Sequence, residues 1–356
     1  MRRLALILLV CSVALAASST AVALRTPAAG VDHGAQVEAS WARDHIRTVV
    51  TAGLLAPTIA SFDPAQRVTR GEVFLALVRL GTEAHLPAEL DAPVTVAELD
   101  AALVRAAGLR PQAQRVRNVL RRAGLRPRPY TGTETVARLL GFRFNHPQDD
   151  DLLELAPTAF VNKAEAAYSL AALIELGADR RARVREAVER LRVPQLAGPE
   201  RALLRRAVRL VGNPYVFAGS SDRLQQVWRS PVLPTELPGG FDCSGLVWRV
   251  FKLDPAASGT RLASVISGRT TFQMSGEVRR GARIGLKRLR PADLLFFGSR
   301  GTKSRPAEVG HAGINLGSGW FVHSSSNGVT LEPFEGWYRT SFAWARRPLA
   351  EAGITV

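Results

Sequence analysis

Phe241-Asp242-Cys243-Ser244-Gly245-Leu246 is the stretch that most decides how this chain folds and which chemistry it carries. Asp242 is a strong helix N-cap residue, and apolar residues then recur at helical spacing. We predict a helix that begins at Cys243 and buries Leu246, Val247, Val250 and Phe251. A thiol in a first helical turn lies near the positive end of the helix dipole and near free amides. Both favour the thiolate, and the amides can stabilise an oxyanion.

Cys243 is the only cysteine outside an apparent export signal, which contains the other, Cys11. Exported proteins usually pair their cysteines, so an odd thiol indicates an intermolecular bridge or a reactive nucleophile. The helix start around Cys243 favours the nucleophile.

The N-terminus has the parts of a secretory signal peptide: Met1-Arg2-Arg3, an apolar run over 4–17, and Ala21-Val22-Ala23 as a cleavage site. We predict that residues 1–23 are removed and that the protein is secreted. The run is shorter than the roughly 20 apolar residues that span a bilayer, so we expect no stable membrane span after cleavage. An uncleaved anchor is the alternative. We do not expect lipidation of Cys11, because a lipoprotein signal has a small residue directly before its cysteine and Val10 is too bulky for that position.

The chain has 356 residues, is 46% hydrophobic and has a formal net charge of +16. This length predicts two folded parts with a core each. The charge favours anionic polymers, either outside a cell or as nucleic acid inside one, and the export signal argues against nucleic acid. The alternative is that the arginines only decorate a solvated surface.

Three stretches in the N-terminal part resemble one another as helix starts. Each has an N-cap residue followed by Glu at the third position and then apolar residues at helical spacing. They are Val68-Thr69-Arg70-Gly71-Glu72, Val94-Thr95-Val96-Ala97-Glu98 and Val161-Asn162-Lys163-Ala164-Glu165. The pattern resembles S-layer homology repeats, although Val96 replaces the basic residue of the motif. The resemblance implies a mostly helical region over 24–177 that binds anionic cell-wall polymers through residues 38–177. A helical spacer is the alternative.

A charged helix over 178–192 is predicted to link this region to a second part, with the boundary near residue 198 at Gly198-Pro199. We therefore expect a linker over 178–198 and a second domain over 199–350. Asn213-Pro214-Tyr215-Val216-Phe217-Ala218-Gly219 predicts a turn that leads into a short strand, followed by an insertion over 220–239.

His311 and His323 lie in a strong hairpin pattern around Gly317-Ser318-Gly319. A three-residue turn would pair Leu316 with Trp320 and Gly313 with His323, which puts both imidazoles on one face as diagonal neighbours. A two-residue turn would shift the register and separate them. The other histidines, His33, His45, His85 and His146, are predicted to be surface or packing residues.

Five motifs in this order resemble the NlpC-type cysteine endopeptidases of bacterial cell walls, over residues 200–348. They are the Asn213 to Gly219 stretch, Asp242-Cys243-Ser244-Gly245-Leu246, Pro291-Ala292-Asp293-Leu294-Leu295-Phe296-Phe297, Gly310-His311-Ala312-Gly313-Ile314 and Phe321-Val322-His323-Ser324. The resemblance implies an α+β fold with a papain-like core, in which a helix that bears the cysteine packs on an antiparallel sheet. The chain departs from the family in the insertion and in Ala292, where the family prefers glycine.

The resemblance assigns the nucleophile to Cys243, the base to His311 and the third polar residue to His323. Tyr215, Asp242 and Ser244 match substrate-binding residues, although each also has a purely structural reading as a core ring, a cap and a helix-start residue.

The function implied is a secreted, wall-associated peptidoglycan hydrolase that cuts stem peptides at the γ-D-glutamyl to diaminopimelate bond. The alternatives are a non-catalytic wall-binding protein, or an amidase or acyltransferase with the same thiol chemistry. We expect no metal and no cofactor, because the candidate histidines serve the thiol and no HExxH or CxxC pattern offers a ligand set.

Overall fold

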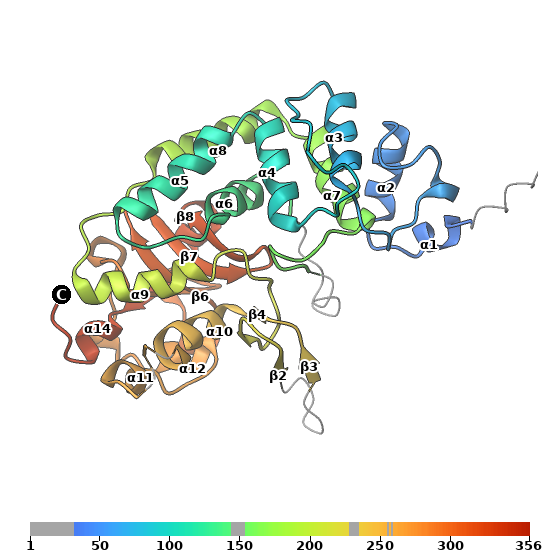
Figure 1. Cartoon of the computed structure of the whole chain (residues 1–356). Coiled ribbons are helices and arrows are strands. Elements are labelled where there is room, and N and C mark those ends of the chain that lie inside the picture. The colour runs from blue at the N-terminus through green and yellow to red at the C-terminus, as the bar shows by residue number, and fades with distance from the viewer. Residues whose placement is uncertain (1–31, 144–153, 228–234, 255, 258) are drawn as a thin grey trace, which may run out of the picture.

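The computed structural model describes residues 32–143, 154–227, 235–254, 256, 257 and 259–356, and Figure 1 shows their arrangement. The predicted signal peptide, Cys11 and His146 lie outside the described residues. Within the described ranges, every helix is too short or too polar to cross a lipid bilayer.

The N-terminal part is built from helices joined by loops. They are α1 (Gly34–Glu38), α2 (Arg43–Thr51), the 3-10 turn η1 (Ile59–Ser61), α3 (Arg70–Arg79), α4 (Val96–Ala106), α5 (Arg110–Arg122), α6 (Thr131–Leu140), α7 (Lys163–Ile174) and α8 (Ala178–Arg190). The three predicted helix starts are confirmed. Thr69 and Thr95 form full capping boxes with Glu72 and Glu98, and the Asn162 side chain accepts from the Glu165 amide.

The three similar stretches meet at one point through a closed ring of backbone hydrogen bonds. The Val68 amide donates to the Val161 carbonyl at 3.0 Å, the Val161 amide to the Val94 carbonyl at 2.9 Å, and the Val94 amide to the Val68 carbonyl at 3.1 Å. All three valines are buried. The starts of α3, α4 and α7 are therefore tied together by equivalent contacts.

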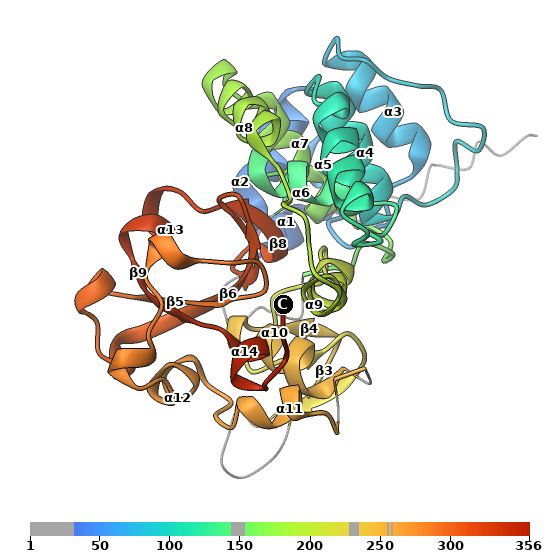
Figure 2. The ribbon, with the colours of Figure 1, turned by 90° about the vertical axis from the view of Figure 1, so that its left-hand side faces the viewer.

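The C-terminal part mixes helices with an antiparallel sheet (Figure 2). Its helices are α9 (Gly198–Arg209), α10 (Cys243–Trp248) with the π-helical turn η3 (Arg249–Leu253), α11 (Arg261–Val265), α12 (Thr271–Gly276), α13 (Gly336–Thr340) and α14 (Pro348–Glu351). The central strands are β5 (Leu294–Gly298), β6 (Val309–Gly317), β7 (Trp320–Ser325), β8 (Gly328–Pro333) and β9 (Phe342–Arg346), in the order β8-β7-β6-β5-β9. Short 3-10 turns join them: η4 (Arg280–Ala282), η5 (Leu286–Arg288), η6 (Gly301–Lys303) and η7 (Pro306–Glu308).

Two small ribbons precede α10. Strand β1 (Ser220–Ser221) pairs with β4 (Gly240–Phe241), and β2 (Gln225–Val227) pairs with β3 (Thr235–Leu237). The short strand predicted within 213–219 does not form. Tyr215 makes only an isolated parallel bridge to Phe241, and Ala218 has a left-handed φ of 65°, which ends any extended run.

The sequence had suggested a separate hydrophobic core for each part. In the structure, the two parts share one core. Val136 of α6 and Val329 of β8 belong to the same buried cluster, and α6 packs directly on β8. Figure 1 shows the helical layer over this edge of the sheet. The charged helix α8 also packs on α5 and α6. The helical part therefore covers apolar surface that the sheet would otherwise expose to water.

The hairpin between β6 and β7 has the shorter of the two turns that the sequence allowed. Gly317 pairs with Trp320, which leaves a two-residue turn at Ser318 and Gly319 with φ values of 51° and 77°. A bulge at Leu316 compensates for the shorter turn, so that Gly313 still pairs with His323. The bulge thus gives the two-residue turn the register at the histidines that was expected only from a three-residue turn.

Candidate active site

Cys243 begins α10, as predicted. The Asp242 carboxylate caps the helix by accepting a 2.5 Å hydrogen bond from the Gly245 amide. The predicted apolar face is confirmed, because the side chains Leu246, Val247, Val250 and Phe251 are fully buried. The helix packs on β6. This packing holds the Cys243 side chain against β6, the central strand, where it contacts the backbone of Ala312.

The Cys243 thiol is not poised as a thiolate, contrary to the expectation from the helix dipole. Burial raises the pKa of Cys243 to about 12, and the neighbouring Asp242 carboxylate adds to this shift. Hydrogen bonds from the backbone of Ala312 and Ser244, together with Arg269, oppose it only in part. Desolvation of the anion therefore outweighs the helix start, and the resting thiol is protonated at neutral pH.

Strand β6 brings a histidine to the same place, since Ala312 directly follows His311. The His311 Nε2 atom lies 3.0 Å from the His323 Nδ1 atom, and the rings are nearly perpendicular at 89°. Burial, with a smaller contribution from His323, holds the pKa of His311 well below its usual range. His311 is therefore neutral at pH 7. Because Nε2 is engaged with His323, Nδ1 is the nitrogen left to accept a proton from the thiol.

Glu332 extends this pair and was missed by sequence reasoning. Its Oε2 atom lies 3.7 Å from the His323 Nε2 atom, a distance that suits an ion pair and is long for a hydrogen bond. Burial raises the pKa of Glu332, but His323, Tyr338 and Asn327 lower it overall. A carboxylate directly after the buried Leu331 on β8 was the available signal, because alternation places Glu332 on the opposite face from Leu331, which is the face of His323.

Aromatic rings enclose the two imidazoles. Phe321 stacks on His323 with ring centroids 4.4 Å apart, and Phe297 lies 5.6 Å from His311. Tyr338 contacts both histidines, at 6.0 Å from His311 and 5.0 Å from His323. This packing buries His323 completely and restricts the orientations of both rings.

A cleft of about 550 Å³ opens beside the thiol. Tyr215, Asp242 and Ser244, the predicted substrate-binding residues, line it together with Cys243. Gln226 and Val227 from the insertion also line it, so the insertion shapes the cleft. The structure therefore brings all of these residues to one place.

Arg269 was also missed, and it organises the cleft wall. Its guanidinium donates to Ser244 Oγ at 2.7 Å, to Asp242 Oδ1 at 3.2 Å, and to the Ala218 and Gly219 carbonyls at 2.9 and 3.2 Å. Asp242 is thus engaged by its cap and by Arg269. Arg269 lies 27 residues from Asp242 in the sequence, so no local pattern indicated that the two side chains meet.

The helical part holds the loop that carries Tyr215. The Tyr215 amide donates to Glu154 Oε2 at 2.8 Å, and Arg138 Nη2 donates to the Gly212 carbonyl at 3.1 Å. Arg138 is fully buried and lies 3.3 Å from both Glu134 and Glu154. The position of the cleft wall therefore depends on side chains from both parts of the chain.

The other described histidines lie in the helical part. His33 hydrogen bonds to Gln36 at 2.8 Å, and the His45 ring packs edge-on against Tyr168 at 4.8 Å. His85 lies 3.9 Å from Glu83 at the surface. These contacts fit the predicted surface and packing roles.

A half-buried thiol at the start of a helix that packs on the strand carrying a neutral imidazole, itself held by a second polar residue, defines the class of sites that supports thiol-based acyl transfer. The family comparison agrees with this class. Residues 212–347 match the NlpC/P60 family, and this part of the chain is an NlpC/P60 family domain.

Curated relatives match over the same part. The chain is 32% identical over 139 residues to the probable endopeptidase Rv2190c of Mycobacterium tuberculosis (strain ATCC 25618 / H37Rv), which covers 39% of this chain and 27% of that protein. It is 29% identical over 140 residues to the murein DD-endopeptidase MepH of Escherichia coli (strain K12), covering 38% and 41%. It is 27% identical over 147 residues to the gamma-DL-glutamyl hydrolase of Bacillus subtilis (strain 168), covering 41% and 28%. The chain thus spans less than half the length of each of these relatives.

A solved NlpC/P60 family protein from Bacillus cereus ATCC 10987 is 23% identical, with a TM-score of 0.31, and the match covers 45% of this chain and 43% of that one.

Proposed function

We propose that the chain is a secreted cysteine endopeptidase that hydrolyses peptidoglycan stem peptides. The observation that carries the proposal is the packing of α10, which begins with Cys243, on β6, whose His311 is hydrogen-bonded to His323 of β7. The NlpC/P60 family match over 212–347 supports it. The core would then be papain-like, with α10 as the nucleophile helix.

The reaction begins with a neutral thiol and a neutral imidazole. His311 Nδ1 takes the thiol proton while Cys243 Sγ forms a bond to the peptide carbonyl, whose oxygen becomes an oxyanion. Backbone amides at the start of α10 stabilise that charge. The C–N bond then breaks, and His311 gives its proton to the leaving amine. Water, deprotonated by His311, attacks the thioester, and the C–S bond breaks to restore the thiol.

His323 and Glu332 act on the charge that forms on His311. In the tautomer that this geometry favours, His311 Nε2–H donates to His323 Nδ1, and His323 Nε2–H points toward Glu332. The carboxylate therefore stabilises the imidazolium that exists only during the reaction. This is a positioning role for His323 and an electrostatic one for Glu332.

The bond that we propose is the γ-D-glutamyl to diaminopimelate bond of the stem peptide. The name of the Bacillus subtilis relative refers to a γ-glutamyl bond, whereas the name of the Escherichia coli relative refers to a D,D bond. Tyr215, Asp242 and Ser244 would hold the substrate beside Cys243, where they line the cleft.

The same proposal places residues 1–23 as a signal peptide, 24–177 as a helical region, 178–198 as a linker and 199–350 as the catalytic domain, in a protein located at the cell wall. The ring of contacts among the starts of α3, α4 and α7 supports a repeated, S-layer-homology-like unit there. Its basic motif residues are already paired, because Arg70 lies 2.8 Å from Glu98 and Lys163 lies 2.9 Å from Glu72. Wall binding by residues 38–177 would therefore need other groups.

The experiment incubates the full chain, without residues 1–23, with defined muropeptides and identifies the products by mass. Cleavage after D-glutamate supports the proposed bond. Cleavage of D,D cross-links would instead identify the D,D bond as the substrate bond. Replacement of water by an added amine would indicate an acyltransferase. Release of intact peptide from the glycan would indicate an amidase. No cleavage by a folded, wall-retained protein would favour the non-catalytic alternative.

A further inference from the structure

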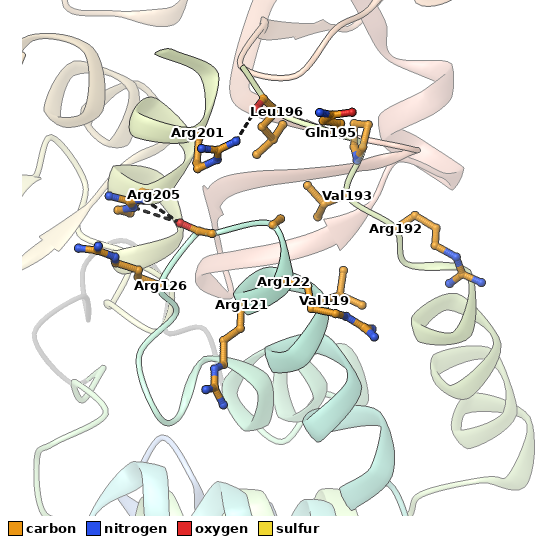
Figure 3. Close-up of a pocket in the computed structure, with 13 residues that line it drawn as sticks. Val119, Arg121, Arg122, Arg126, Arg192, Val193, Gln195, Leu196, Arg201 and Arg205 are labelled. Atoms are coloured by element: carbon orange, nitrogen blue, oxygen red, sulfur yellow. Dashed lines mark hydrogen bonds between the residues drawn. The ribbon is translucent and has the colours of Figure 1, made fainter. Parts of the chain in front are cut away.

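A second large groove lies between the two parts of the chain, away from the thiol. It has a volume of about 800 Å³ and is formed by the end of α5 with its following loop, the segment between α8 and α9, and the first turns of α9. It shares no lining residue with the active-site cleft. Figure 3 shows that arginines from all three segments surround it.

The charge in this groove is positive and unpaired. Its lining includes Arg121, Arg122, Arg126, Arg192, Arg201 and Arg205, and it includes no acidic side chain. In the described part of the chain, none of these six guanidinium groups forms a salt bridge, whereas Arg70 and Lys163 of the helical repeats do. Six like charges gathered without a counter-charge predict an anionic occupant.

Three of the arginines are held in place by backbone carbonyls, including Arg192, which donates to the Glu189 and Leu191 carbonyls at 2.7 and 2.9 Å. Arg205 donates twice to the Gly124 carbonyl, at 3.2 and 3.0 Å, and Arg201 donates to the Leu196 carbonyl at 2.7 Å. A guanidinium has five N–H donors, so each keeps at least three for a ligand. Side chains that are already oriented in the free protein strengthen binding, because less side-chain conformational freedom is lost when the ligand binds.

The backbone of the loop is shaped around these side chains. Gly124 has a left-handed φ of 75°, and a Cβ atom there would lie 2.9 Å from Arg201 Cδ. Arg126 adopts a φ of 51°, which is unfavourable for a side chain other than glycine, asparagine or aspartate. Strain of this kind concentrates at functional sites.

The lining also excludes several ligand classes. It is completed by Val119, Ala123, Gly124, Val193, Pro194, Gln195 and Leu196, so it offers no aromatic ring for stacking a nucleobase or a sugar. It offers no carboxylate to bind sugar hydroxyls. The arginines come from three segments, and a tetrahedral phosphate accepts hydrogen bonds in several directions, so a chain of phosphates can pair with guanidinium groups that lie apart from one another.

We propose that this groove binds a flexible, phosphodiester-linked polyanion that lacks bases. In the cell wall, it would hold the hydrolase on anionic polymer, a role that rests on the proposed function. The binding itself does not depend on hydrolysis.

The test measures binding of the full chain to end-labelled linear inorganic polyphosphate by fluorescence anisotropy over a range of salt concentrations. Arg122→Gln/Arg126→Gln removes two groove charges that make no hydrogen bond within the described residues. Arg279→Gln/Arg280→Gln removes two exposed charges elsewhere and is the matched control. The groove variant should weaken binding at least about 10-fold and lower the salt slope by about two, or one per lost contact. The control should change affinity by less than about 2-fold.

A second variant keeps the charge constant. Arg201→Lys/Arg205→Lys loses the planar forks and should weaken binding several-fold, which a purely diffuse charge effect would not do. Equal losses in the groove and control variants would overturn the site. Tighter binding of single-stranded DNA, or of polyglutamate with the same charge, would overturn the assigned ligand class. Hydrolysis of soluble muropeptides should be the same in Arg122→Gln/Arg126→Gln as in the unmodified chain, so failure of the site and failure of the proposed enzyme activity are distinguishable.

Discussion

His311 Nε2 and His323 Nδ1 lie 3.0 Å apart on neighbouring strands, and His323 is completely buried. In the proposed mechanism, this contact commits one nitrogen of His311 to orientation and leaves the other for proton transfer. It depends on the bulge at Leu316, which restores the register that a two-residue turn would otherwise shift. A backbone irregularity seven residues before His323 thus determines whether the site exists.

Replacing His323 tests this relationship. Phenylalanine fits the aromatic packing against Phe321 but cannot accept the hydrogen bond, so His323→Phe should lower kcat/KM by about 10²-fold to 10⁴-fold. His323→Asn keeps a polar acceptor and should recover most of that loss. Steady-state hydrolysis of a muropeptide measures both variants, with the urea unfolding midpoint as the check on folding. Near-normal activity of His323→Phe would mean that His311 needs no partner.

The protonated thiol predicts a characteristic pH dependence. With a Cys243 pKa of about 12, the thiolate fraction should rise about tenfold per pH unit, so alkylation by iodoacetamide should accelerate from pH 7 to 9 without a plateau. The rate of hydrolysis should fall only below pH 6.5, where His311 becomes protonated and can no longer act as the base, because the pKa of His311 lies well below that value. Mass-detected labelling measures the first property, with Cys243→Ala as the blank. Fast alkylation that is constant from pH 5 to 8 would instead reveal a preformed thiolate and imidazolium pair.

Glu154 links stability to pH at the junction between the two parts. Burial raises the pKa of Glu154 to about 7, although Arg138 and Arg143 oppose the shift. A raised carboxyl pKa gives stability that is fully present below the unfolded value of about 4.5 and is lost as pH rises through 7. Glu154→Gln removes this dependence. The free energy of unfolding of the variant minus that of the unmodified chain should therefore rise by up to about 3 kcal/mol as the pH increases from 4.5 to 8. Urea unfolding at several pH values measures the difference, and a constant difference would contradict the assignment.

Ala292 offers a test of backbone strain. It is buried and has a left-handed φ of 66°, the position at which the resembled family prefers glycine. Relief of this strain is worth about 1 to 2 kcal/mol, and the greater freedom of glycine in the unfolded chain offsets about half of it. Ala292→Gly should therefore raise the free energy of unfolding by roughly 0.5 to 1 kcal/mol. A destabilised Ala292→Gly variant would show that the strain is relieved in another way.

Local patterns in the sequence were enough to predict the helix starts and the face of α10 that carries Cys243. N-caps and helical spacing involve residues within a few positions of one another, so the Asp242 cap and the buried Val250 could be inferred directly. The register that unites His311 and His323 was left open between two turn lengths, because the bulge at Leu316 has no signal in the local sequence.

The remaining parts of the site depend on contacts between distant segments. Arg269 meets Asp242 across 27 positions, and Glu154 meets Tyr215 across 61. The high pKa of Cys243 arises from burial by the whole fold, which helix-start reasoning does not include. The arginine groove likewise forms only where α5 and α9 come together.

The most direct test of the central claim compares the full chain, without residues 1–23, with its Cys243→Ala and His311→Ala variants on a defined muropeptide, with products identified by mass. All three proteins should fold with similar unfolding midpoints. The unmodified chain should cleave the stem peptide after D-glutamate, Cys243→Ala should give no product, and His311→Ala should lose at least about 10²-fold in rate. Hydrolysis by Cys243→Ala at the rate of the unmodified chain would contradict the thiol mechanism.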